Sequence, residues 1–194
     1  MLDGDEIKQI LYSVIEDEIG KEKIQTEMTS DIKLSRKYIE LIMNKCIAKL
    51  GSQSNDDDYY FYATTVTALS EALLHFMLTI CTLPSERKIA TKNGLSLDVI
   101  IPSLQTLKLK PEKSIIVQFI KEKTDLNKVS QLESLEPYHK NIWLVSAKPL
   151  SLTTKHTTYY VLPNAKPDNR FSNIIIGIDN FLKEIGDKSF RLVH

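Results

Sequence analysis

An aspartate and a lysine stand in two neighbouring apolar segments near the middle of the chain. Asp98 lies in LSLDVIIP, residues 95–102, and Lys121 ends SIIVQFIK, residues 114–121. Short runs rich in β-branched residues favour strands. On adjacent strands a carboxylate can bind a divalent cation, and an amine beside it can help to orient a water molecule for attack on a phosphate ester. Glu71, in the apolar helical segment before them, could add a second carboxylate.

The order of the elements around these residues resembles the core of the PD-(D/E)XK, or restriction-endonuclease-like, superfamily. Residues 59–147 read as helix, strand, strand, strand, helix and strand. In that family an aspartate on the second strand and an acid-x-lysine sequence on the third bind Mg²⁺, and the preceding helix often adds a glutamate. The resemblance implies that Glu71, Asp98 and Lys121 are catalytic residues. It also implies that Asp98 and Glu71 are metal ligands and that Mg²⁺ is the cofactor.

The sequence departs from this motif two residues before Lys121, where the family has an acid and this chain has Phe119. Side chains alternate across a strand, so Phe119 should share the face of Lys121 while Gln118 points the other way unless a bulge intervenes. Mg²⁺ requires oxygen ligands, and a phenyl ring supplies none. We therefore expect no cofactor. We expect Asp98 to be a strand-end acid paired with Lys121 or with a backbone N–H group.

Three functions stay open at this point. The one we favour is a non-catalytic interaction or regulatory domain on a nuclease-like scaffold, which would not be an enzyme. The second is a metal-dependent nuclease with an atypical site built from Glu71, Asp98 and Lys121, with Gln118 or Glu122. The third is a nucleic-acid-binding protein without chemistry. The partner would be another protein, a second copy bound through the N-terminal helices, or nucleic acid, but not a membrane.

Composition is that of a globular protein. The chain has 194 residues, of which 42% are hydrophobic and 26% charged, and its net charge is zero. Zero net charge gives no bulk attraction to nucleic acid or membranes. The charge is uneven, however: residues 1–60 carry 8 Lys and Arg against 13 Asp and Glu, and the remainder carries 17 against 12. The acidic, polar start differs from a secretory signal, so we expect a cytoplasmic protein.

The pattern predicts an α/β fold with a mixed central β-sheet flanked by helices and an N-terminal helical pair. Residues 1–52 form a helical extension with apolar stripes over residues 7–19 and 34–50, packed on an α/β body at 56–194. In that body the apolar residues 63–83 favour a buried helix over a membrane span, and Asn93-Gly94 indicates a hairpin. Strands are predicted at 87–91, 95–101, 114–121, 141–147, 157–162 and 190–193. Helices are predicted at 125–135, capped by Asp125, and at 171–185, with a polar loop at 102–113.

The remaining polar residues give weaker signals. His75 follows Glu71 by four residues, so the two should meet on one helix face as a core pair. The other histidines, His139, His156 and His194, have no ligand spacing. Tyr159 and Tyr160 stand near basic residues and could stack nucleic-acid bases, but an ordinary sheet edge explains them better. Cys46 and Cys81 lie among apolar residues and are expected in the core.

Overall fold

The centre of the protein is a five-stranded mixed sheet, seen in a computed structural model that describes residues 3–51, 59–91, 94–121, 125–150, 155–162 and 166–186. The strand order is β1-β2-β3-β4-β5. β1 and β2 form an antiparallel hairpin, β3 runs antiparallel to β2, and β4 and β5 continue parallel to β3. The strands are β1 (Glu86–Ala90), β2 (Ser96–Ile101), β3 (Ile115–Ile120), β4 (Ile142–Ser146) and β5 (Thr157–Tyr160).

The predicted mixed α/β fold is confirmed. Each of the five described strands begins and ends within two residues of the predicted bounds. The hairpin predicted at Asn93-Gly94 joins β1 to β2, with Gly94 at φ 77°, a conformation that glycine adopts at little cost. The sixth predicted strand, 190–193, lies outside the described residues.

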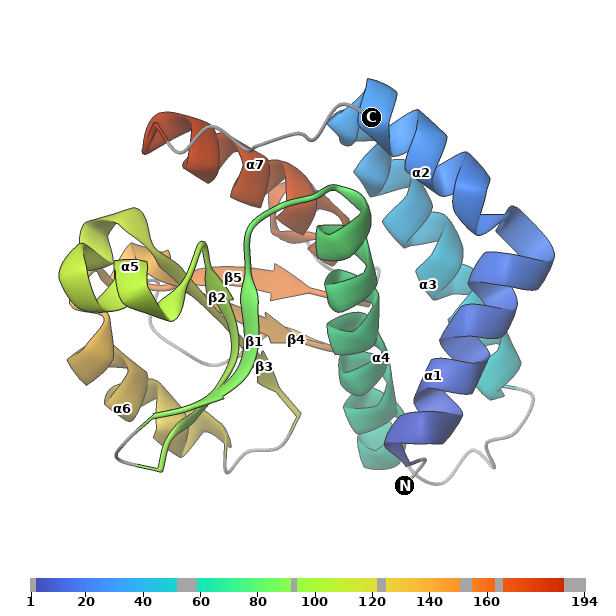
Figure 1. Ribbon diagram of the computed structural model, residues 1–194. Coiled ribbons are helices and arrows are strands. Elements are labelled where there is room, and N and C mark those ends of the chain that lie inside the picture. Colours follow the sequence, from blue (N-terminus) through green and yellow to red (C-terminus); the bar gives the residue numbers. More distant parts are fainter. Residues whose placement is uncertain are drawn as a thin grey trace.

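Helices cover both faces of the sheet, and alternation along each strand divides the apolar residues between them. Val117 and Phe119 of β3 belong to a core shared with α4 (Tyr59–Ile80) and α7 (Ile174–Glu184). Ile116 and Ile120 point the other way, into a smaller core with α5 (Leu104–Leu109) and α6 (Leu126–Leu135). Figure 1 shows α4 and α7 on one side of the sheet and α5 and α6 on the other.

The central helix, α4, is long and apolar enough to cross a membrane by length and composition. Its segment Phe61–Ile80 contains an 18-residue stretch with a mean hydropathy of 1.3, and 67% of that stretch is buried inside the protein. It packs against β3 and β4 on one side and against α1 and α3 on the other. A helix that is apolar nearly all round and covered on several sides is typical of a protein core.

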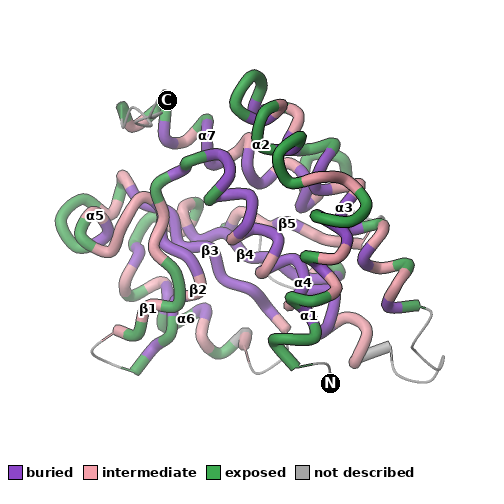
Figure 2. Tube along the Cα trace, turned by 45° about the vertical axis from the view of Figure 1, so that its right-hand side comes forward, coloured by how far each residue is buried: buried purple, intermediate pink, exposed green. Residues whose placement is uncertain are grey.

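In the described part of the chain, three α-helices rather than the predicted pair precede α4. α1 (Gly4–Ser13) continues as a π-helix at Val14–Ile19, α2 spans Lys21–Ser30, and α3 spans Ser35–Gly51. The apolar stripes of α1 and α3 are confirmed, but no stripe was predicted for α2, which buries only Ile24 and Met28. Figure 2 shows these helices buried toward α4 and exposed on their outer turns.

The N-terminal helices and the α/β body share one continuous core. Leu11, Ile24 and Ile42 belong to the same cluster of buried residues as Leu73 of α4 and Val117 of β3. Cys46 and Cys81 are both buried in the core, as predicted. The division of the chain into an extension at 1–52 and a body at 56–194 stays a prediction, since residues 52–58 lie outside the described chain.

The predicted polar loop at 102–113 is wrong, because it contains α5 and a 3₁₀ turn. Ser103 caps α5 by accepting a hydrogen bond from the backbone N–H of Thr106, and Leu107 is buried. Six residues are too few to show a helical period in the sequence. The short 3₁₀ helices are Ile32–Leu34, Pro111–Lys113, His139–Asn141, Pro167–Asn169 and Phe171–Asn173.

The shared core generates a stability prediction for α4. Leu73 is fully buried between the sheet and the N-terminal helices, and removing most of a buried leucine costs about 2–5 kcal/mol. We expect Leu73→Ala to lower the free energy of unfolding by that amount in urea titration. Thr79→Ala, at an exposed position of the same helix, should change it by less than about 0.5 kcal/mol. Equal effects of the two variants would contradict the placement of α4.

Candidate functional site

Asp98 lies at the point where β2 separates from β3. The paired register of the two strands ends at Val99 opposite Val117. Beyond it, Oδ2 of Asp98 accepts a 2.8 Å hydrogen bond from the backbone N–H of Phe119 and a 2.6 Å bond from Nε2 of Gln118. The carboxylate thus satisfies a β3 N–H group that the strand ladder leaves unpaired. Of the two partners expected for Asp98, a backbone N–H is observed.

The hydrogen-bonded pairing of β2 with β1 is also interrupted at Asp98. The pairs Arg87–Val99 and Ile89–Leu97 flank Lys88 and Asp98, which do not pair. Lys88 has a φ of +51°, in the left-handed region that residues with a side chain seldom adopt. The separation of the strands explains why Gln118, whose strand neighbours Ile116 and Ile120 face α6, still reaches the carboxylate of Asp98.

Burial raises the pKa of Asp98 to about 6. The hydrogen bond from the Phe119 N–H acts against this rise, because it stabilises the charged form. Glu71 raises the pKa further, while Lys121 and Lys128 lower it. Asp98 therefore shares one electrostatic neighbourhood with a second carboxylate and two amines.

Glu71 and Lys121 form a partly buried ion pair that joins α4 to the end of β3. Nζ of Lys121 lies 2.5 Å from Oε2 of Glu71, whose side chain is only 10% exposed. The backbone carbonyl of Lys121 accepts a bond from the hydroxyl of Thr64, one more link between β3 and α4. Lys121 thus pairs with Glu71 rather than directly with Asp98, and no hydrogen bond joins Glu71 to His75 in the described residues.

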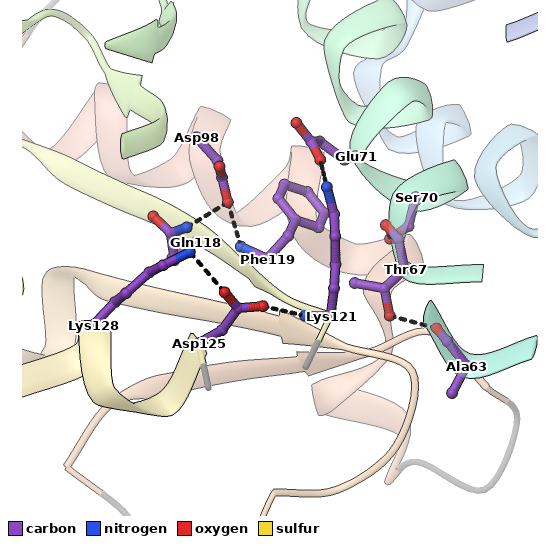
Figure 3. A network of polar contacts seen from close by, with 10 residues as sticks. All are labelled: Ala63, Thr67, Ser70, Glu71, Asp98, Gln118, Phe119, Lys121, Asp125 and Lys128. Atoms are coloured by element: carbon purple, nitrogen blue, oxygen red, sulfur yellow. Dashed lines mark hydrogen bonds and ion pairs between the residues drawn. The ribbon is translucent and has the colours of Figure 1, made fainter. Parts of the chain in front are cut away.

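Phe119 fills the space between these charged groups. Its side chain is 1% exposed, and Figure 3 shows the ring lying between Asp98 and Lys121 below the carboxylate of Glu71. Gln118, on the other side of Asp98, is 2% exposed, and its Oε1 has no hydrogen-bond partner among the described residues. The position that would carry the third metal ligand therefore holds an apolar ring.

Asp125 does not cap the helix that it precedes, so that prediction is wrong. Its carboxylate accepts a 3.0 Å bond from the backbone N–H of Lys121 and pairs with Nζ of Lys128 at 2.7 Å. The side chain thus holds the end of β3 against the start of α6 instead of binding the free N–H groups of α6.

Comparison with solved structures identifies the architecture. The restriction endonuclease PspGI, solved as a substrate DNA complex, matches with a TM-score of 0.50 and 14% identity over 92% of this chain and 93% of that chain. Metal-depleted Ecl18kI, in complex with uncleaved, modified DNA, matches with a TM-score of 0.50 and 10% identity over 95% and 86%. The chain has a restriction-endonuclease-like fold. No family model and no curated protein matches the sequence.

The restriction-endonuclease-like fold brings Glu71, Asp98 and Lys121 together from α4, β2 and the end of β3. Sequence reasoning named these three but missed the contact of Gln118 with Asp98, because strand alternation alone turns Gln118 away. It also missed a hollow of about 320 Å³ beside the site, between α1, α4 and β1. The hollow is lined by Lys8, Leu11, Tyr12, Lys21, Ala72, His75, Phe76, Thr79, Ile80 and Arg87.

This hollow, hereafter the basic hollow, combines three cations with an imidazole. Lys8 and Lys21 come from the N-terminal helices, Arg87 comes from β1, and none of the described lining residues is an acid. Burial lowers the pKa of His75 to about 4, and Glu71 opposes this while Arg87, Lys88 and Lys121 add to it. His75 is therefore neutral near neutral pH. Lys8 pairs with Asp5 at the surface, and Arg87 makes no ion pair in the described chain.

Tyr159 and Tyr160 were considered as residues that could stack nucleic-acid bases. For Tyr159 this alternative is wrong. Tyr159 is 7% exposed and its ring lies 5.4 Å from that of Trp143 in the core. β5 is the edge of the sheet, as the simpler interpretation of this segment predicted.

The raised pKa of Asp98 generates a pH prediction. An acid whose folded pKa lies above its usual value of 3.8 stabilises the fold when protonated, and that contribution is lost as the pH rises through about 6. Asp98→Asn keeps an oxygen for both donors without the charge. We expect it to gain stability over the wild type by about 2 kcal/mol as the pH rises from about 4 to about 7.

Urea unfolding of both proteins across this range measures the effect. Asp168→Asn, at an exposed acid, is the control and should follow the wild type. A stability difference between Asp98→Asn and the wild type that stays constant with pH would contradict a buried, charged Asp98.

Proposed function

We propose that this chain is a non-catalytic nucleic-acid-binding protein built on a restriction-endonuclease-like scaffold, and that its partner is duplex DNA. The observation that carries the non-catalytic part is the buried ring of Phe119 on the face of Lys121. In a metal-dependent nuclease of this motif that position holds a carboxylate. Here an apolar side chain occupies it, and one oxygen each of Asp98 and Glu71 already holds an N–H donor.

The residues present are a poor fit to Mg²⁺. This ion demands near-octahedral oxygen coordination, and the described side chains beside Phe119 offer only two carboxylates. Oδ2 of Asp98 already accepts two N–H groups, and Oε2 of Glu71 already holds the amine of Lys121. We therefore derive no chemical step through a metal at this place.

Two observations support DNA as the partner. Both restriction endonucleases that match over most of their length were solved with DNA. The basic hollow places Lys8, Lys21 and Arg87 beside the site without an acid among its described lining residues. Cations on one surface attract the phosphate backbone and release its counterions. An interaction partner that is a protein, or a second copy bound through the N-terminal helices, would not require this basic hollow.

One observation favours a second candidate, metal-dependent cleavage. Oδ1 of Asp98 and Oε1 of Glu71 accept no hydrogen bond from the described residues, and Glu71 raises the pKa of Asp98. Two neighbouring carboxylate oxygens of this kind attract a divalent cation. The two candidates differ in a measurable way, because only the second requires metal at Asp98.

The catalytic test uses wild type, Asp98→Ala and Lys121→Ala. We expect no saturable heat of Mn²⁺ or Mg²⁺ binding in calorimetric titration at this site, and no cleavage of single- or double-stranded DNA or RNA. Cleavage that depends on metal and is lost in Asp98→Ala and Lys121→Ala would replace the proposal with the nuclease. Cleavage that neither substitution reduces would indicate a contaminating enzyme.

The binding test measures the affinity for duplex DNA over a range of salt concentrations. Arg87→Ala should weaken binding by about tenfold, since a hydrogen bond to a charged group contributes roughly 1.5 kcal/mol. It should also reduce the slope of log affinity against log salt by about 0.9, the value for one phosphate contact.

Lys166→Ala removes a matched exposed cation near β5, at the opposite edge of the sheet from β1. It should leave both the affinity and the salt slope unchanged. Equal losses in Arg87→Ala and Lys166→Ala would mean that binding is not centred on the basic hollow. No binding of wild type at low salt would remove DNA as the partner.

A further inference from the structure

A carboxylate and two imidazoles meet at the amino-terminal ends of the parallel strands. Glu133 lies in α6, His139 in the 3₁₀ turn before β4, and His156 immediately before β5. One potential ligand atom from each lies within 4.8 Å of the other two. Nε2 of His156 is 3.0 Å from Oε1 of Glu133, and the two imidazole rings meet edge to face with centroids 6.0 Å apart.

Both imidazoles keep a buried nitrogen that has no hydrogen-bond partner among the described residues. The atoms are Nδ1 of His139 and Nδ1 of His156, and His156 as a whole is 8% exposed. Buried polar atoms in native proteins are nearly always hydrogen-bonded, and an orphan atom calls for an ion or a water. Nδ1 of His139 thus has no described partner, and His156 turns its Nε2 toward the same carboxylate of Glu133.

We propose that Glu133, His139 and His156 form a binding site for a divalent transition-metal ion, with Zn²⁺ as the best fit. Imidazole nitrogen and carboxylate oxygen are ligands of Zn²⁺ at about 2.0–2.2 Å. Two ligands on one tetrahedral ion then lie roughly 3.3 Å apart, close to the 3.0 Å between His156 and Glu133. A rotation of the His139 side chain brings its nitrogen into range, and one water completes four ligands.

A neighbouring cation competes with a metal ion for the carboxylate of Glu133. The competitor is Lys155, whose Nζ lies 2.6 Å from Oε1 of Glu133. The side chain of Lys155 is 45% exposed and can turn into water, leaving the carboxylate to a cation of higher charge.

This site is separate from the one around Asp98 and does not rest on the proposed function. Lys121 follows the carboxyl end of β3, whereas His139 and His156 precede the amino ends of β4 and β5. A metal here joins α6 to the segments that enter β4 and β5. Its effect is therefore on the stability of this half of the sheet.

The test uses the full chain without a histidine tag, stripped of metal by chelation. We expect calorimetric titration with ZnCl₂ to give one saturable site per chain, and Zn²⁺ to raise the melting temperature. Co²⁺ should give the visible absorption of a four-coordinate site. His139→Ala and Glu133→Gln should each weaken Zn²⁺ binding by at least about tenfold, because even the loss of groups that only support a ligand costs 10–100-fold.

Two further variants decide the outcome when a ligand substitution disturbs folding. Glu112→Gln changes an exposed glutamate and should leave Zn²⁺ affinity unaltered. Lys155→Ala removes the competing ammonium and should tighten binding. No saturable site in the wild type, or affinity that His139→Ala, Glu133→Gln and Lys155→Ala all leave unchanged, would overturn the proposal and leave an ordinary ion-pair network.

Discussion

The burial of α4 between the sheet and the N-terminal helices is the constraint on which the rest of this structure depends. The helix is covered by the sheet on one side and by the N-terminal helices on the other. A helix in this position can afford few polar groups, and each needs a partner because an unpaired buried charge is costly. Glu71 finds its partner in Lys121 at the end of β3. The candidate site therefore lies where the apolar contact between helix and sheet gives way to an ion pair.

The polar cluster around Asp98 follows from the local separation of β2 from β3. Once the ladder ends at Val99, an N–H group of β3 would be left unpaired inside the protein. The carboxylate of Asp98 satisfies that group and the amide of Gln118 together. These bonds stabilise the charged form while burial destabilises it, and burial has the larger effect on the pKa. These hydrogen bonds give Asp98 a structural role that does not require it to be catalytic.

The two polar clusters stand at opposite ends of the parallel strands and differ in chemistry. The first has carboxylates, amines and a phenyl ring, and one oxygen each of Asp98 and Glu71 is engaged by N–H groups. The second has one carboxylate and two imidazoles, each with a buried nitrogen that has no hydrogen-bond partner in the described chain. Hard cations prefer the ligands of the first cluster and borderline cations those of the second. One of the two clusters was therefore expected from a sequence motif, and the other matches no motif.

The sequence by itself determined the α/β class, the strand positions, the buried central helix and the three residues Glu71, Asp98 and Lys121. They follow from local periodicity and from a family resemblance, and both can be recognised in the linear sequence. It did not reveal α2 or α5, because a helix with two buried residues or six residues in all shows no period. It also could not reveal the pairing of Lys121 with Glu71, the contact between Gln118 and Asp98, or the meeting of Glu133, His139 and His156. Those contacts join residues 6 to 50 positions apart, and only the packing of helices on a twisted sheet brings them within bonding distance.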